Sequence, residues 1–269
     1  MFQLFNYDTG LIYTIEKEDR FPDGTLHLTL PHGNIDSIIW DYENDAELFT
    51  LICIRKHYSK PMRLIIPYLP NARMDRVKNK SDVFTLKYFC DIINSLNFFE
   101  VAVLDPHSNV SLALLDNVAV IPFIQPFYIA YSDFIKDFKE EDTIIFFPDE
   151  GAMKRYASDI GKPYAFGMKN RDWETGKILN LEIINKEFVK DKNVLIVDDI
   201  CSRGGTFLHS ANALYEAGAA SVSLYITHAE NTMVSGEMYN SNLIRKIYTA
   251  NTIFDKSKDF KNLVTVVEW

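Results

Sequence analysis

One segment of the chain places two acids directly before a glycine-rich turn. It begins at Asn193 and reads Asn-Val-Leu-Ile-Val-Asp-Asp-Ile-Cys-Ser-Arg-Gly-Gly-Thr, so an apolar run ends in Asp198 and Asp199. A helix-like pattern starts after Gly204 and Gly205. Backbone amides that paired glycines expose at the start of a helix can hold a phosphate group. Two carboxylates beside such amides can bind Mg²⁺ or the hydroxyl groups of a sugar. The segment therefore fits a ligand that is both a phosphate and a polyol, such as a ribose phosphate.

The same segment also has a purely structural interpretation. Two aspartates after a strand commonly form a helix N-cap and a solvated loop. The pattern is neither a Walker A loop nor a dinucleotide fingerprint, because no lysine follows the glycines and no third glycine is suitably spaced. Taken alone, the segment leaves the binding role and the structural role open.

Polar residues that can bind phosphate or a metal ion also follow other apolar runs. They are Arg73, Asp75 and Arg76, then Asp105 and His107, then Asp149, and finally Lys169 and Arg171. The planar guanidinium group binds phosphate through two parallel hydrogen bonds. Three of these groups also have a structural alternative. The arginines can form a surface ion pair with Asp75, the imidazole can make a structural hydrogen bond, and the last two cations can be a solvated charge cluster.

Short apolar, β-branched runs alternate with helical patterns along the chain. The predicted strands are Ser37–Trp40, Arg63–Pro67, Val101–Leu104, Val118–Ile121, Thr143–Phe147, Tyr164–Gly167, Val194–Val197, Val222–Thr227 and Lys246–Thr249. The predicted helices are Asp45–Tyr58, Asp82–Leu96, Glu150–Ile160 and Phe207–Ala217. This alternation predicts βαβ units with parallel sheets. In such sheets ligands bind beyond the carboxyl ends of the strands, where the candidate polar residues are expected to lie.

No linker or repeat marks a domain boundary. Pro122 and Pro126 bracket a short segment that we expect to be a turn. A division there predicts two similar halves, residues 1–123 and 124–269, that face each other across the active site.

Composition and charge exclude several classes of function. The 269 residues, 47% of them hydrophobic, support a substantial core in one or two domains. The net charge of −9 argues against a broad nucleic-acid footprint. No stretch predicts a membrane span or a secretory signal, and the three scattered cysteines lack zinc-site spacing. We therefore expect a cytoplasmic protein without nucleic-acid or membrane partners.

Taken together, these motifs resemble those of ribose-phosphate diphosphokinase, also called phosphoribosyl-diphosphate synthetase. The resemblance spans nearly the whole chain. It includes Phe21-Pro-Asp23-Gly24, which is similar to an N-terminal hairpin of the family, and the segments 44–48 and 225–228, which are similar to its first long helix and a late strand. It implies an α/β fold of two similar phosphoribosyltransferase-type halves, each a mainly parallel sheet flanked by helices.

The family transfers a diphosphate from ATP to the anomeric hydroxyl of ribose 5-phosphate and releases AMP, with Mg²⁺ as the cofactor. By resemblance, the catalytic residues are Lys169, Arg171 and His107, the first two in a mobile loop that continues through residues 172–177. ATP would be bound in the N-terminal half by Phe21, Asp23, Arg73, Asp75, Arg76 and His107. The metal bound to ATP would be held by His107 and Asp149, and a second Mg²⁺ by Asp198 and Asp199. The ribose phosphate would be bound by Asp198, Asp199, Ser202, Arg203, Gly204, Gly205 and Thr206. The resemblance also implies a homo-oligomer built from dimers.

The loop formed by residues 198–206, called the sugar-phosphate loop below, departs from the family pattern Asp-Asp-x-x-Asp-Thr-Gly-Gly-Thr. Ser202 stands in place of the third acid and Arg203 in place of the following threonine. The two changes shift the local charge by about two units at neutral pH. They favour an acceptor with more phosphate charge at its 5′ end, such as ADP-ribose, which relatives in this superfamily use in NAD salvage. Met74 and Thr25 also replace a family glutamine and glutamate, which affects ATP binding.

Three functions compete on the sequence alone. The first is an ATP-dependent diphosphokinase that acts on ribose 5-phosphate or on ADP-ribose. The second is a phosphoribosyltransferase, which would not need the cationic residues assigned to ATP. The third is a regulatory relative without catalytic activity, which the loss of the third acid at Ser202 would fit.

Overall fold

The computed structural model describes residues 1–6, 9–16, 19–171 and 178–269, and only the backbone within 169–171 and 178–181. The chain forms two compact units, Met1–Pro122 (unit 1) and Phe123–Trp269 (unit 2). Within the described ranges, no helix combines the length and apolar character that crossing a membrane requires.

Unit 1 is built on a six-stranded sheet with the order β2-β1-β5-β6-β7-β8. Its strands are β1 (Phe2–Asn6), β2 (Leu11–Ile15), β5 (Ser37–Trp40), β6 (Arg63–Ile66), β7 (Glu100–Leu104) and β8 (Val118–Ile121). The last four are parallel neighbours, whereas β1 runs antiparallel to both β2 and β5. A separate antiparallel hairpin joins β3 (Asp19–Arg20) to β4 (Leu26–His27).

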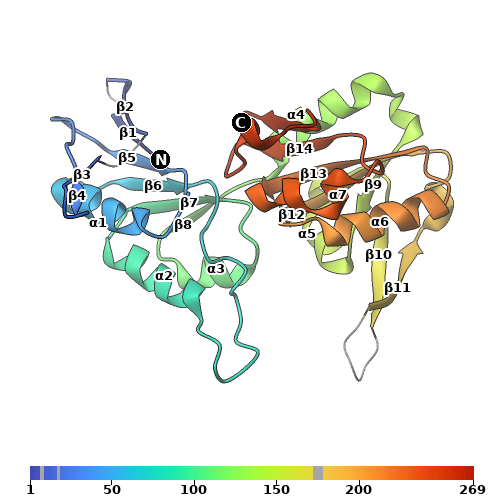
Figure 1. The fold of residues 1–269 in the computed structure, drawn as a ribbon, viewed down its shortest axis with the longest axis horizontal. Coiled ribbons are helices and arrows are strands. Elements are labelled where there is room, and N and C mark those ends of the chain that lie inside the picture. Colours follow the sequence, from blue (N-terminus) through green and yellow to red (C-terminus); the bar gives the residue numbers. More distant parts are fainter. Residues whose placement is uncertain (7–8, 17–18, 172–177) are drawn as a thin grey trace. The chain divides into compact units, whose positions relative to one another are not determined.

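Three helices connect the parallel strands of unit 1. They are α1 (Glu47–His57), α2 (Thr85–Ser95) and α3 (Asn109–Leu114). Because each connection joins neighbouring parallel strands, right-handed crossovers place the helices on one face of the sheet (Figure 1). They share a core with Leu4, Trp40 and Leu64 from that face. This arrangement leaves the loops after β6 and β7 together at the carboxyl edge.

Unit 2 contains a seven-stranded sheet with the order β11-β10-β9-β12-β13-β14-β15. Its strands are β9 (Thr143–Phe147), β10 (Tyr164–Arg171), β11 (Ile178–Ile184), β12 (Asn193–Cys201), β13 (Ser221–Ala229), β14 (Ile247–Ala250) and β15 (Val264–Val267). All neighbours are parallel except β10 and β11, which form an antiparallel hairpin at one edge.

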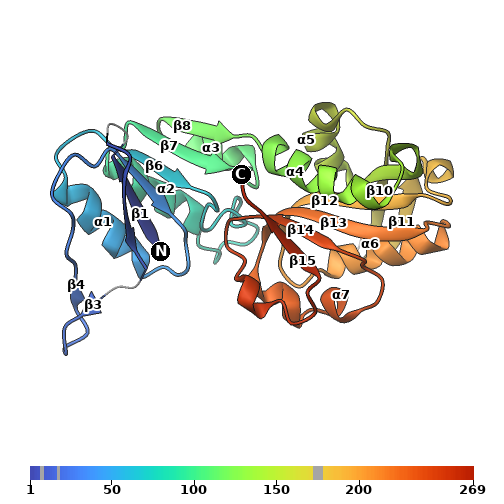
Figure 2. The same cartoon turned by 90° about the horizontal axis from the view of Figure 1, so that it is seen from above.

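Helices cover both faces of this second sheet. They are α4 (Ile124–Phe134), α5 (Glu150–Ile160), α6 (Gly205–Glu216) and the short α7 (Glu237–Asn240). Figure 2 shows α4 and α5 on one side of the strands and α6 and α7 on the other. Side chains of β12 alternate between the two faces. Leu195 and Val197 pack with α4 and α5, whereas Val194 and Ile196 pack with α6.

The predicted fold class, two α/β halves with mainly parallel sheets flanked by helices, is confirmed. The predicted turn at 122–126 is wrong, because α4 begins at Ile124. Pro126 lies in the first turn of that helix, where a missing backbone N–H costs little. Several strands are longer than predicted, most clearly β10, which continues to Arg171, and β12, which continues to Cys201.

Candidate functional site

The acid pair lies on the central strand of unit 2, where that strand extends beyond its neighbour. Strand β12 pairs with β9 only as far as Ile196, but it remains paired with β13 through Cys201. Asp198 and Asp199 therefore lie at the carboxyl edge of the parallel sheet, where ligands of such sheets bind. The Asp199 amide donates to Asp198 Oδ1 at 3.0 Å, and the Ile200 amide donates to Asp199 Oδ1 at 2.8 Å. The backbone thus fixes both carboxylates.

Negative charge accumulates around Asp198. Burial raises its pKa well above the usual value, and the neighbouring Asp199 carboxylate and then Asp149 raise it further. Two acids so close together are costly to keep ionised, unless a cation lies beside them. The electrostatics of this cluster therefore fit a divalent cation.

One cation at this site was not predicted from the sequence. Arg155, on α5, donates through a guanidinium nitrogen to Asp199 Oδ2 at 3.3 Å. Its guanidinium carbon also lies 5.1 Å from the centre of the Tyr156 ring. The usable signal in the sequence was that Arg155 follows two turns of helix after Asp149, itself a predicted site residue.

Asp149 joins β9 to α5 and forms the N-cap of that helix. Its Oδ1 accepts a hydrogen bond from the Ala152 amide at 3.1 Å. The structural use of an aspartate as a cap, considered in the sequence for the acid pair, is thus found at Asp149 instead. A cap fixes the carboxylate at the carboxyl edge of β9, the strand next to β12.

The glycine turn leads directly into α6. Gly204 has a φ of +77°, a left-handed conformation that favours glycine, and Gly205 is the first residue of the helix. The first amides of an α-helix have no acceptor within the helix, so this end can bind an anion. Gly205, Thr206 and Arg203 are exposed, while Ser202 is half-buried. The structure therefore brings the whole predicted sugar-phosphate loop to one edge of unit 2.

Four of the residues predicted to bind ATP, together with Asp105, lie in the loops that follow β6 and β7 in unit 1. Asp105 follows β7 with a φ of +43°, and its amide donates to the Ile121 carbonyl at 3.3 Å. His107 is half-buried in the turn before α3. Arg76 is exposed and its Nε lies 3.8 Å from Asp75 Oδ1, so the surface ion pair weighed in the sequence is present. Arg73, in the same loop after β6, is exposed.

The hairpin β3–β4 presents Phe21 at its tip, with half of the residue surface exposed. The turn is held by Asp23, whose Oδ1 accepts from the Thr25 hydroxyl at 2.7 Å and from the Thr25 amide at 2.9 Å. These bonds, the hydroxyl first, lower the pKa of Asp23. The Phe21 ring centre lies 4.7 Å from that of His27. The turn is thus internally braced and carries an exposed aromatic ring.

Lys169 and Arg171 lie on the β10–β11 hairpin rather than in a loop. Lys169 is the register partner of Leu181 and Arg171 that of Ile178, with an irregularity between Asn170 and Arg171. The predicted mobile stretch 172–177 lies outside the described residues. The backbone of these two cations is therefore part of the sheet.

The predicted metal ligands come from both units, with His107 in unit 1 and Asp149, Asp198 and Asp199 in unit 2. In the described part of the chain, no group of three or more His, Cys, Asp and Glu side chains is arranged to hold a metal ion. Asp149 and Asp199 both add negative charge near Asp198, and carboxylate oxygens are the ligands that Mg²⁺ prefers.

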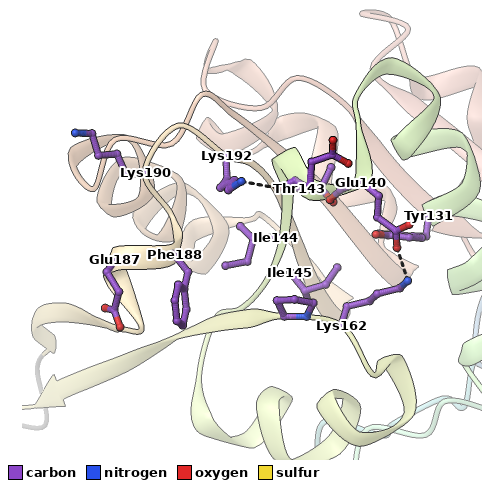
Figure 3. Close-up of a pocket in the computed structure, with 12 residues that line it drawn as sticks. Tyr131, Glu140, Thr143, Ile144, Ile145, Lys162, Glu187, Phe188, Lys190 and Lys192 are labelled. Carbon is purple, nitrogen blue, oxygen red and sulfur yellow. Dashed lines mark hydrogen bonds and ion pairs between the residues drawn. The ribbon is translucent and has the colours of Figure 1, made fainter.

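A groove of about 730 Å³ lies at the opposite, amino edge of the same sheet (Figure 3). Ile144 and Ile145 from the start of β9 form part of its lining, Lys162 pairs with Glu140 there, and Phe188 lies on the far side. Because the acid pair lies at the carboxyl edge, this groove is separate from the candidate site.

The chain was compared with known families and structures. Residues 140–261 match the model of the phosphoribosyl transferase domain. The fold is similar to that of phosphoribosylpyrophosphate synthetase from Mycobacterium smegmatis, with a TM-score of 0.76, 20% sequence identity, and coverage of 95% of this chain and 86% of that one. The fold is therefore of the phosphoribosyltransferase type, with two units.

Relatives named ribose-phosphate pyrophosphokinase show which family with this fold the chain belongs to. The chain is 30% identical to the one from Pyrococcus abyssi, over 78% of this chain and 74% of the relative. It is 32% identical to the one from Campylobacter jejuni, over 78% and 68%, and 29% identical to that from Saccharolobus solfataricus, over 89% and 84%. The chain belongs to the ribose-phosphate pyrophosphokinase family, a family of diphosphotransferase enzymes, and the resemblance found in the sequence is confirmed.

Proposed function

We propose that the protein transfers the β,γ-diphosphate of ATP to the anomeric hydroxyl of ribose 5-phosphate and releases AMP. The observation that carries this proposal is the sugar-phosphate loop. It places Asp198 and Asp199 only a few residues before the start of α6 at Gly205. The carboxylates bind the sugar hydroxyls, and the amides at Gly205 and Thr206 bind the 5-phosphate. Family membership supports the use of ATP.

The proposed roles of the other candidate residues follow mainly from the charge of their side chains. Arg73 and Arg76 bind the phosphates of ATP, and Phe21 with Asp23 contributes to the nucleotide site. Lys169 and Arg171 neutralise charge that develops during transfer. The ligands for Mg²⁺ are assigned to His107 in unit 1 and to Asp149 and the acid pair in unit 2, and Mg²⁺ would neutralise charge on the phosphate oxygens. We also propose that the protein works in the cytoplasm as a homo-oligomer built from dimers.

The proposal is tested by incubating the protein with ATP, Mg²⁺ and ribose 5-phosphate and identifying the products by mass. AMP together with phosphoribosyl diphosphate is the expected result. Formation of a nucleotide from phosphoribosyl diphosphate and a base, without use of ATP, would show a phosphoribosyltransferase instead. The absence of turnover with every acceptor would show a regulatory relative.

Alanine substitutions at the two glycines of the turn are expected to have different effects, one on ligand binding and the other on stability. At Gly205 a Cβ would have no atom within 4 Å, so Gly205→Ala should keep the thermal midpoint. The proposal gives the open space beside the first amides of α6 to the 5-phosphate, so a methyl group on Gly205 should hinder binding and lower kcat/KM for ribose 5-phosphate by about 10- to 100-fold. At Gly204, which has a φ of +77°, a Cβ would lie 2.7 Å from Met238 Cε, so Gly204→Ala should lower the thermal midpoint.

Thermal melting and steady-state kinetics on both variants check this prediction. A Gly205→Ala protein with the stability and the acceptor kinetics of the wild type would show that the phosphate binds elsewhere.

Acceptor choice depends on the two departures in the loop, and the exposed Arg203 favours ADP-ribose as a second candidate acceptor. If its guanidinium binds the added phosphoryl group, the bond contributes roughly 1.5–3 kcal/mol. The double substitution Ser202→Asp with Arg203→Thr should then shift the ratio of kcat/KM values towards ribose 5-phosphate by about ten- to a hundredfold. An unchanged ratio, measured with both acceptors, would remove the loop from acceptor selection and with it the argument for a role in NAD salvage.

A further inference from the structure

A segment that follows β13 is pressed against the sugar-phosphate loop. This segment, Glu230–Tyr239, is called the clamp below. Its first amide, on Glu230, donates to the Cys201 carbonyl at 2.8 Å. Further along, Met233, Met238 and Tyr239 are fully buried in the core that α6 shares with the sheet. The clamp is therefore held at its start by a backbone hydrogen bond and at its end by burial in the core.

The closest approach between clamp and loop is at Gly236. A Cβ built on this residue would lie 2.0 Å from the Arg203 carbonyl oxygen and 2.8 Å from the carbonyl carbon. The backbone of Gly236 is ordinary, with a φ of −81°. Glycine is thus required here by the nearness of another backbone and not by its own conformation.

This contact sets the direction of one peptide group in the loop. In a trans peptide the C=O and N–H point to opposite sides. Because the Arg203 carbonyl faces Gly236, the Gly204 amide is turned away from the clamp. Next along the chain, Gly204 itself packs on Met238, whose Cε and Cβ would lie 2.7 and 2.8 Å from an added Cβ. Two consecutive residues of the turn are therefore placed by the clamp.

The clamp is in turn anchored to the C-terminal part of unit 2. The Tyr239 hydroxyl donates to Asp259 Oδ1 at 2.7 Å and accepts from the Lys261 amide at 3.0 Å. The same carboxylate accepts from the amides of Leu263 and Val264 at 3.0 and 2.9 Å. A continuous set of packed and hydrogen-bonded groups thus runs from the start of β15 to the turn at Gly204.

We propose that the clamp sets the position of the sugar-phosphate loop and that Gly236 is a positioning residue for the acceptor. The inference rests on the proposed function, since it takes this loop to be the acceptor site. Gly236 does not touch the ligand in this arrangement. It acts by leaving room for the Arg203 carbonyl, so that the Arg203–Gly204 peptide keeps the orientation in which the Gly204 amide is turned away from the clamp.

The decisive variant is Gly236→Ala, compared with the wild type and with Glu237→Ala, an exposed neighbour on α7. Binding of ribose 5-phosphate and of ATP is measured separately by calorimetry, and folding by thermal melting. For Gly236→Ala we expect the dissociation constant of ribose 5-phosphate to rise about ten- to a hundredfold, as loss of one hydrogen bond to a charged group predicts. The affinity for ATP should not change, and Glu237→Ala should match the wild type.

A second variant covers the case in which Gly236→Ala does not fold. Tyr239→Phe keeps the ring and removes the two hydrogen bonds that anchor the clamp, so it should weaken acceptor binding by a smaller factor and leave ATP binding intact. Unchanged acceptor affinity in a folded Gly236→Ala protein overturns the inference, as does an equal loss for both ligands. If Gly236→Ala does not fold, unchanged acceptor affinity in Tyr239→Phe overturns it. Wild-type protein that binds ribose 5-phosphate but forms no AMP contradicts the proposed function and leaves the clamp intact.

Discussion

Lys169→Ala and Arg171→Ala are each expected to lower kcat by about 10²–10³-fold, while the dissociation constant of ATP stays nearly unchanged. The reason is that a preorganised cation acts mainly on charge that develops in the transition state. Both residues lie on β10, whose hairpin with β11 fixes their backbone before substrates arrive. Binding of ATP in the ground state is assigned instead to the arginines of unit 1.

Single-turnover kinetics and equilibrium binding of ATP separate the two effects. Lys186→Ala is the matched control, because this exposed lysine follows the same hairpin two residues after β11. A large loss of ATP affinity with kcat unchanged would show that the two cations bind the ground state instead.

The second large effect is expected for Asp198→Asn, which should lose activity by at least about 10²-fold and yet melt at a higher temperature near neutral pH. Burial, Asp199 and Asp149 raise the pKa of Asp198 above its usual 3.8. The folded state therefore holds this proton more tightly than the unfolded chain does. The contribution of Asp198 to stability is complete below about pH 3.8 and is lost as the pH rises through the raised pKa.

Asparagine cannot ionise, so the Asp198→Asn variant does not lose this stability as the pH rises. Thermal midpoints measured from pH 4 to pH 8 should converge at the acidic end and separate towards neutrality, by about 2–4 °C for each kcal/mol relieved. Added Mg²⁺ should stabilise the wild type more than the variant. A variant that melts below the wild type at neutral pH would mean that the ionised carboxylate has a stabilising partner.

The parts of this molecule that are encoded locally could be predicted from sequence. The run ending in Asp198, the turn at Gly204 and the helix Glu150–Ile160 all follow from neighbours in the chain. The parts that were missed depend on distant partners. β1 and β2 are stabilised by pairing with each other and with β5. The role of Arg155 depends on the packing of α5 beside β12, which brings its guanidinium group to Asp199.

Proline was the least reliable signal in this sequence. Pro126 was interpreted as part of a turn, but a proline is equally compatible with the first turn of a helix, and the sequence alone did not distinguish the two. The lengths of β10 and β12 were underestimated for a different reason. Both continue through polar residues, which strand patterns based on apolar runs do not count.

The anchoring of the clamp by Asp259 bears on the order in which the protein becomes functional during synthesis. The acid pair and the glycine turn leave the ribosome some sixty residues before Asp259 and the strand β15 that follows it. Until Asp259 has emerged and β15 has paired with β14, Tyr239 lacks the hydrogen bond to Asp259 that anchors the clamp. A nascent chain can thus hold the acid pair and the glycine turn before the residue that anchors the clamp has been synthesised, and the turn would take its final position only after Asp259 has joined the fold.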